Sequence, residues 1–210
     1  MSVKGIPALV EILKNYRNKL TDEEKSWVKL AKIDCEKVSR TIQTGEGQSY
    51  SASYYEHAKR IHNDAYKKEV QMATMLASFG LTVHLIQETT YGGSKIDALV
   101  NDVPVDFKMV GSGNSAIKQN YQKGMDKQHC RGIIMYMQTE STYRIKWRGT
   151  TREVFLEKAV ESYTKQHKNG LLAIWIDDKQ EFKVFDMQKT RAAHNNAARG
   201  NASAFAPAPD

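Results

Sequence analysis

Two aspartates and a lysine on neighbouring predicted strands are the residues of this chain best placed to do chemistry. Asn101 and Asp102 favour a two-residue turn between two apolar segments whose side chains alternate. That turn places Asp97 directly opposite Asp106 across a hairpin, and Lys108 shares their face because side chains alternate along a strand. Two carboxylates about 5 Å apart repel each other unless they share a proton or bind a cation.

A third carboxylate is predicted to approach this hairpin from a helix. The helix predicted over residues 53–78 carries apolar residues three and four positions apart, continuing to Phe79: Ile61, Ala65, Met72, Leu76 and Phe79. Glu69 falls on this stripe, so we expect it to point toward the sheet, where an unpaired carboxylate is costly. Three carboxylates with Lys108 predict a site for Mg²⁺ or Mn²⁺, since no Cys or His lies at ligand spacing nearby.

A simpler interpretation of the same residues is open. Asp97 and Asp106 would be strand residues facing solvent, with Lys108 as a neighbouring ion pair. Glu69 would be a partly exposed helix residue. A metal site is favoured because it explains all four residues together, whereas the simpler interpretation explains each of them separately.

The elements that position these residues are predicted from hydrophobic periodicity and from capping and turn signals. We expect a helix over 6–20, a second from the Thr21 capping box to about Arg40, a linker over 41–52, and a third helix from Ser53 with Glu56 in its capping box. Strands are then expected over 81–88, 96–100 and 103–110, followed by a helix over 115–128 and a buried strand over 132–137. Beyond these we expect a strand over 143–147, a helix over 150–167 and a hairpin of 171–176 with 181–185.

This order predicts an α/β fold with a mixed β-sheet flanked by helices. Its core has the order α-β-β-β-α-β, which is helix, three strands, helix, strand. Residues 1–50 are predicted to form an N-terminal helical extension and residues 51–190 the main domain. Residues 191–210, rich in Ala, Asn and Pro, are predicted to be a disordered tail.

The positive charge of the chain is concentrated after the hairpin. The net charge is +7, and residues 111–199 hold 16 Lys and Arg against 9 Asp and Glu. A basic half favours a polyanionic partner, of which nucleic acid is the commonest. The candidate contacts lie on the 115–128 helix, shortly after it, and along and just after the 143–147 strand: Lys118, Lys123, Lys127, Arg131, Arg144, Lys146 and Arg148. A solvated helix face and a charged edge strand that discourages aggregation are the alternatives.

The composition predicts a soluble chain with one core. It is 40% hydrophobic, and no apolar run approaches the roughly 20 residues that a membrane span needs. The amino terminus has no basic-then-apolar signal pattern, so no membrane segment or export signal is expected. Cys35 and Cys130 show no CxxC spacing and are expected to be buried thiols.

A helical glutamate, then Asp97 on one strand and Asp106-Phe107-Lys108 on the next, resembles the PD-(D/E)xK nuclease superfamily. The stretches "GGSKIDALVND", "VPVDFKMVGSG" and "NSAIKQNYQKG" are similar to one branch of it. That branch comprises the tRNA-cleaving toxin domains at the C-termini of contact-dependent growth inhibition proteins, with relatives in phage and mobile-element proteins. The resemblance covers about residues 55–140, and the chain has no Pro before Asp97.

The resemblance implies a divalent metal, Mg²⁺ or Mn²⁺, bound by Asp97 and Asp106 with Glu69 as a further ligand. Lys108 would orient or deprotonate the attacking water. The implied function is that of a ribonuclease acting on tRNA as an antibacterial toxin domain, paired with a cognate immunity protein. Such a domain is delivered into target cells as part of a larger secreted protein and acts in the cytoplasm.

Two other functions are compatible with the same residues. One is a DNA endonuclease of a phage or mobile element. The other is a non-catalytic nucleic-acid-binding or phage structural protein of the same fold. The intact set of Glu69, Asp97, Asp106 and Lys108 speaks against the second, because a degenerate site would have lost a member.

Overall fold

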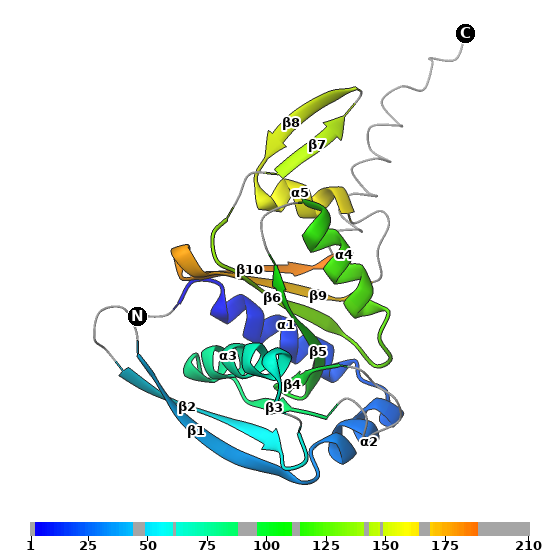
Figure 1. The fold of residues 1–210 in the computed structure, drawn as a ribbon. Helices are drawn as coiled ribbons and strands as arrows, with labels where there is room; N and C mark the ends of the chain where they lie inside the picture. Colours follow the sequence, from blue (N-terminus) through cyan, green and yellow to red (C-terminus); the bar gives the residue numbers. More distant parts are fainter. Residues whose placement is uncertain are drawn as a thin grey trace.

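The computed structural model of the chain describes residues 3–43, 49–60, 62–87, 96–110, 114–140, 143–147, 149–163 and 169–188 (Figure 1). The helices are α1 (Ile6–Asn18), α2 (Asp22–Ala31), α3 (Asp64–Ser78), α4 (Asn114–Met125) and α5 (Leu156–Tyr163). The strands are β1 (Cys35–Gln43), β2 (Ser49–His57), β3 (Val83–Leu85), β4 (Ala98–Val100), β5 (Val103–Val110), β6 (Gly132–Met137), β7 (Tyr143–Trp147), β8 (Thr150–Val154), β9 (Leu171–Ile176) and β10 (Glu181–Asp186).

Eight of these strands form one mixed sheet in the order β1-β2-β3-β4-β5-β6-β9-β10, and β7 pairs with β8 in a separate ribbon. The pairs β2–β3, β5–β6 and β6–β9 are parallel, whereas the other pairs of the sheet are antiparallel. Figure 1 shows the β1–β2 hairpin and the β7–β8 ribbon at opposite ends of the molecule. The predicted α/β fold with a mixed sheet flanked by helices is confirmed, and α3-β3-β4-β5-α4-β6 has the predicted order of elements.

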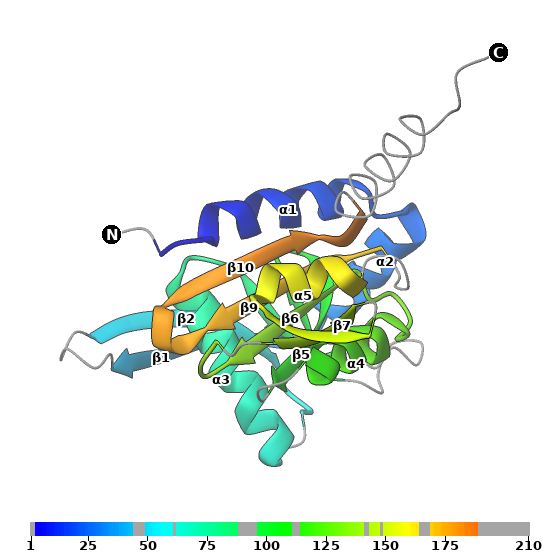
Figure 2. The same cartoon turned by 90° about the horizontal axis from the view of Figure 1, so that it is seen from above.

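The buried side chains form two clusters on the two faces of this sheet. Residues of α1 and α3 pack in one cluster with Val105 and Phe107 of β5. Residues of α2, α4 and α5 pack in the other with Leu99 and Ile133. Figure 2 shows α1 running alongside β10. Because Val105 and Phe107 point toward the α3 face, Asp106 between them points toward the α4 face.

The β4–β5 hairpin has the turn and the register that the sequence predicts. Asn101 and Asp102 both adopt left-handed backbone conformations, with φ of 48° and 68°. This geometry matches the right-handed twist of the two strands that the turn connects. Val100 pairs with Val103. Ala98 pairs with Val105, so Asp97 and Asp106, the next residues outward, lie opposite each other as predicted.

Over the described residues between 32 and 63, the predicted course of the chain is wrong. The Thr21 capping box is present, but α2 ends at Ala31 instead of reaching Arg40, and β1 follows. The expected linker and the start of the third helix are largely strand, because β2 pairs with β1 along nine residues of each. The backbone hydrogen bonds between β1 and β2 stabilise both strands, and the secondary-structure propensities of the residues do not predict this pairing. The helix α3 begins later, after an Asn63 cap whose side chain accepts the N–H of Tyr66.

Residues 3–43 contribute to the sheet and its core. Leu9 and Leu13 of α1 are fully buried, and β1 is a strand of the main sheet. The description of residues 1–50 as a helical extension is therefore wrong from β1 onward. Its helical part packs against the sheet and is not a separate appendage.

The second half of the chain follows the prediction with one exception. The strands β6, β7 and β9 have the predicted bounds, but residues 150–154 form β8 where a helix was expected to begin. The strand predicted over 81–88 is too long, because β3 covers only Val83–Leu85. Glu88 at its predicted end and the predicted tail over 191–210 lie outside the described residues. Cys35 and Cys130 are free thiols, and Cys130 is buried as expected, whereas Cys35 is only partly buried. None of the described helices is long and apolar enough to span a membrane.

Candidate active site

Asp97 and Asp106 meet across the β4–β5 hairpin, as the turn register predicts. Asp97 directly precedes β4 and is 5% exposed, and Asp106 lies within β5 and is fully buried. The Oδ2 atom of Asp97 accepts the backbone N–H of Phe107 at 2.7 Å. This hydrogen bond fixes the Asp97 carboxyl against β5, beside Asp106.

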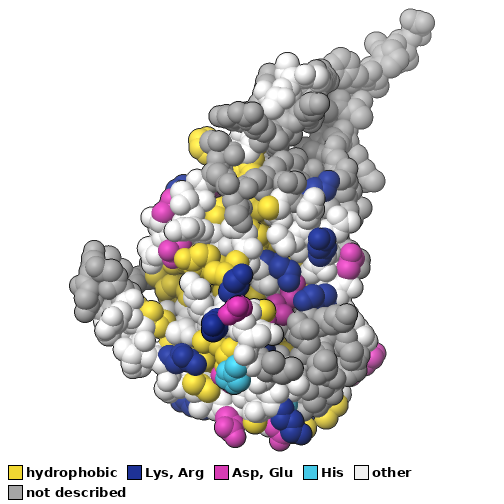
Figure 3. Space-filling view, in the orientation of Figure 1, with side chains coloured by type: hydrophobic (Ala, Val, Ile, Leu, Met, Phe, Trp, Pro, Cys, Tyr) yellow, Lys and Arg dark blue, Asp and Glu magenta, His cyan; other side chains and the backbone are white. Residues whose placement is uncertain are grey.

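Two lysines contact this carboxylate pair. The Nζ atom of Lys108 lies 2.5 Å from Oδ2 of Asp106, and Nζ of Lys127 lies 2.6 Å from its Oδ1. Lys127 is also 3.9 Å from Oδ1 of Asp97. Both lysine side chains are partly exposed, whereas the carboxylates are buried. Figure 3 shows Lys and Arg side chains beside acidic ones near the middle of the face seen in Figure 1. The cluster therefore has two acidic and two basic groups.

The two carboxyl groups differ in their affinity for protons. Burial, together with the negative charge of Asp106, raises the pKa of Asp97 to about 7. Burial acts on Asp106 in the same direction, but hydrogen bonds from Asp97, Lys108 and Lys127 outweigh it and hold the pKa of Asp106 below its ordinary value. In mildly acidic solution the pair therefore keeps one proton, on Asp97, and this proton relieves the repulsion between the two groups.

The carboxylate pair fits a hard divalent cation by the chemistry of its donors. Both donors are oxygens, which Mg²⁺ and Mn²⁺ prefer, and Mg²⁺ is commonly held by one or two carboxylates with water and phosphate oxygens completing its shell. The Oδ2 atom of Asp106 is paired with Lys108 at 2.5 Å, so a cation at this oxygen would take the place of the Lys108 ammonium.

Glu69 lies outside this cluster. It is on α3, which packs on the opposite face of the sheet, and its carboxylate is ion-paired with Arg60. Arg60 donates to the carbonyl of Ile86, whose own N–H donates to the carbonyl of Asp97 at 3.1 Å. Glu69 is therefore linked to the Asp97 backbone through two residues. Among the described residues, no group of three Asp, Glu, His or Cys side chains is arranged to hold a metal.

The stripe on which Glu69 was placed is shifted in the structure. Ala65 is exposed in the first turn of α3, and Ile61 lies outside the described residues. The buried face of α3 consists of Tyr66, Val70, Met72, Ala73 and Leu76. Glu69 lies at the border of this face and is half-buried, so it does not point fully toward the sheet as predicted.

Lys127 is the site residue whose role the sequence did not reveal. It was predicted only as a groove or surface lysine, yet among the described basic residues it lies closer to Asp106 than any except Lys108. The feature that could have identified Lys127 is the parallel connection from β5 through α4 to β6. Because Asp106 pairs with Ile133, the segment that enters β6 must pass beside Asp106.

The backbone of Gly124 in α4 leaves room for the Asp106 carboxylate. A Cβ atom at Gly124 would lie 2.3 Å from Cδ1 of Ile133 and 2.8 Å from Oδ2 of Asp106. Alanine normally stabilises a helix by about 1 kcal/mol relative to glycine. At this position we expect the opposite effect: Gly124→Ala should lower the free energy of unfolding by about 1–3 kcal/mol, because the added methyl group overpacks the contact with Ile133 and Asp106. Chemical denaturation tests this, with Gln122→Ala on the exposed side of α4 as the control.

The other predicted nucleic-acid contacts lie on α4, on and after β7, and at Arg131, which directly precedes β6 and is ion-paired with Glu24. Lys118 is half-buried and Lys123 exposed on α4, the helix that covers the aspartate face. Arg144 and Lys146 belong to β7 by their backbone, but their side chains are outside the described residues, as is Arg148 altogether. The structure therefore places two predicted basic contacts on the helix next to the site.

Comparisons of this chain with protein-family models, with characterised proteins and with solved structures find no match.

Proposed function

We propose that this chain is a metal-dependent nuclease that hydrolyses phosphodiester bonds. The observation that carries the proposal is the buried Asp97–Asp106 pair with Lys108 in contact on the same face of the sheet. Burying two adjacent carboxylates costs stability, and such arrangements cluster at sites that bind cations or move protons. A structural role would be served equally well by apolar residues of similar volume.

The residues of the cluster have complementary roles in this proposal. Asp97 and Asp106 would hold Mg²⁺ or Mn²⁺, which would supply Lewis-acid activation of a phosphate oxygen and of water. The partly exposed Lys108 side chain would orient the attacking water or stabilise charge on the phosphate in the transition state. Lys127 balances the charge of the carboxylates, and with a cation in place it would be able to contact a phosphate oxygen. Glu69 joins the ligands only if it leaves Arg60.

We further propose that the fold is of the PD-(D/E)xK type and that the substrate is tRNA. The order α3-β3-β4-β5-α4-β6, with the aspartates on the β4–β5 hairpin and Lys108 two residues after Asp106, supports the fold assignment. The basic surface of α4 beside the site supports a nucleic-acid substrate. An antibacterial toxin role, with a cognate immunity protein and delivery within a larger secreted protein, follows from the resemblance of the sequence.

A substrate panel tests the activity. The purified chain is incubated with tRNA, with an unstructured RNA and with plasmid DNA, each with Mg²⁺, Mn²⁺ or a chelator. We expect tRNA cleavage that requires the metal and stops with the chelator. Cleavage of the plasmid alone would identify a DNA endonuclease, and binding without any cleavage would identify a non-catalytic protein.

A matched pair of lysine variants separates this activity from a contaminating nuclease. Lys108→Met removes the ammonium next to Asp106, so we expect it to abolish cleavage. Lys158→Met removes an exposed lysine of α5 and should cleave like the wild type. Equal cleavage by both variants would contradict the role of Lys108.

A further inference from the structure

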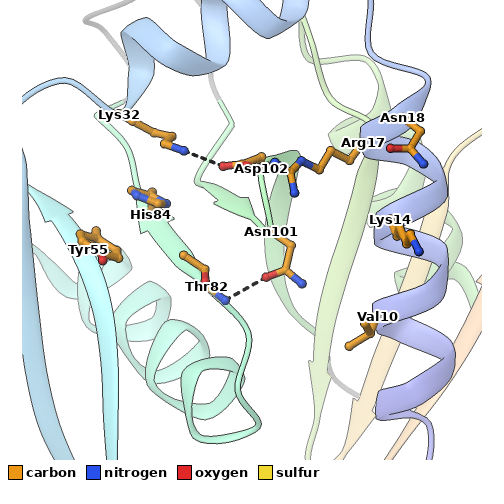
Figure 4. A pocket seen from close by; sticks show the side chains of 10 residues that line it. All are labelled: Val10, Lys14, Arg17, Asn18, Lys32, Tyr55, Thr82, His84, Asn101 and Asp102. Carbon is orange, nitrogen blue, oxygen red and sulfur yellow. Dashed lines mark hydrogen bonds and ion pairs between the residues drawn. The ribbon is translucent and has the colours of Figure 1, made fainter.

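A pocket of about 610 Å³ lies at the turn of the β4–β5 hairpin, between α1 and the strands β2 and β3 (Figure 4). It is separate from the Asp97–Asp106 cluster. Asp102, which lines the pocket, precedes Asp106 by four residues of extended chain, about 13 Å at the rise of a strand. The proposed nuclease site therefore does not account for this pocket.

The charged groups around this pocket are mostly cationic. Lys14 and Arg17 come from α1, Lys32 follows α2, and Asp102 is the one carboxylate among the described lining residues. Asp102 forms ion pairs with Arg17 at 3.0 Å and with Lys32 at 2.7 Å. Three cations thus face one anion, which leaves an excess of positive charge for a ligand.

Amide groups add further hydrogen-bond donors. The side-chain oxygen of Asn101 accepts the N–H of Thr82 at 2.9 Å, so its NH₂ group is left as a donor (Figure 4). Asn18 of α1 also lines the pocket. Such a lining suits a ligand with several acceptor oxygens.

His84 provides a second and independent indication of a ligand. Its ring is 7% exposed and stacks on Tyr55, with ring centroids 4.4 Å apart and planes within 9°. Within the described residues its Nδ1 atom is buried and has no hydrogen-bond partner. Burial, with the charge of Lys32 adding to it, lowers the pKa of His84 to about 4, so the imidazole is neutral near pH 7. A buried polar atom without a partner is costly unless something pairs with it.

We propose that this pocket binds a nucleotide, with its phosphate near Lys14, Arg17 and Lys32 and its base near Tyr55 and His84. Phosphate oxygens match the donor-rich side of the pocket, and a nucleobase offers both a flat face and polar edge groups to the aromatic side. The nucleotide is either a free monophosphate or the phosphorylated end of a nucleic acid. The proposal is independent of the nuclease activity, because none of these residues contacts the aspartate pair.

Asp102 makes the proposal distinguishable from a purely structural ion-pair network. It occupies donors of Arg17 and Lys32 that a phosphate would use, so it competes with the ligand. Asp102→Asn removes this competing charge and keeps the left-handed backbone, since asparagine tolerates φ of 68°. We expect this variant to bind nucleotides several-fold more tightly, a gain that misfolding cannot produce.

The test measures binding of the four nucleoside 5′-monophosphates, adenosine and inorganic phosphate to the full chain by calorimetry in chelator. We expect at least one monophosphate to bind, and its binding to weaken about tenfold in Lys14→Met and in His84→Phe, which keeps the ring stack. Lys29→Met, on the exposed side of α2, is the control and should not change affinity. Thermal melting of each variant establishes that it is folded.

Several results would overturn the proposal. These are no binding of any monophosphate at millimolar concentration, equal binding of adenosine and its monophosphate, equal binding of inorganic phosphate, or no gain in Asp102→Asn. A short oligonucleotide with and without a 5′-phosphate distinguishes the two sources of the ligand. Tighter binding of the phosphorylated oligonucleotide than of the mononucleotide assigns the pocket to a strand end, and weaker or equal binding assigns it to free nucleotide.

Discussion

Asp106→Asn is expected to abolish nucleic-acid cleavage and to leave the protein folded and able to bind nucleic acid. The change keeps the size of the side chain but removes the charge that a metal requires. Loss of a residue that only supports a metal ligand costs about 10–100-fold in affinity or activity, so loss of a ligand should cost at least a hundredfold. The fold should tolerate the change, because Asp97 then no longer faces a second carboxylate and can itself pair with Lys127.

Single-turnover cleavage and binding, measured in parallel, test this prediction. Asp178→Asn replaces an exposed aspartate at the β9–β10 turn and is the matched control. Binding by Asp106→Asn should equal or exceed that of the wild type, since a negative charge near the phosphate has been removed. If Asp106→Asn cleaves as fast as Asp178→Asn, the aspartate pair is not the active site.

Asp97→Asn is expected to change the pH dependence of stability by several kcal/mol. The pKa of Asp97 is raised in the folded state to about 7, so the folded protein keeps a proton that the unfolded chain has lost above pH 4. Stability from this group is therefore present at low pH and is lost as the pH rises toward 7. A shift of about three pKa units corresponds to about 4 kcal/mol. Asparagine resembles the protonated acid, because it can accept the Phe107 N–H and donate to Asp106.

Urea denaturation of both proteins between pH 4 and pH 9 gives the difference in free energy of unfolding. Relative to the wild type, Asp97→Asn should gain stability steadily up to about pH 7 and remain level above it. His84 has the opposite pH dependence: its pKa is lowered, so its contribution to the free energy of unfolding is lost as the pH falls toward 4. Both proteins contain His84, so this contribution cancels in the difference. A difference that does not vary with pH would show that Asp97 ionises normally.

The aspartate pair was predictable because everything that positions it is local. A two-residue turn at Asn101 and Asp102 fixes the register, and alternation along two short strands then determines which side chains share a face. The burial of the pair follows from the apolar residues on either side of it. No partner distant in the sequence is needed to place Asp97 beside Asp106.

The parts that were not predicted depend on contacts distant in the sequence. Lys127 reaches Asp106 only through the crossover that brings β6 beside β5, a separation of 21 residues. The environment of Glu69 depends on where α3 begins and on Arg60 in the connection before it. The strand β1 has no strong apolar alternation of its own and is a strand because β2 pairs with it.

Calorimetric titration of the wild type with Mg²⁺ at pH 6 and pH 8.5, in buffers of different ionisation enthalpy, tests the metal-binding role of the pair most directly. At pH 6 a cation must displace the proton on Asp97, so close to one proton should be released for each Mg²⁺ bound. At pH 8.5 the release should fall almost to zero, and Asp106→Asn should lose the binding at both pH values. Mg²⁺ binding that is unchanged in Asp106→Asn, or that releases no proton at pH 6, would contradict a metal centre built on Asp97 and Asp106.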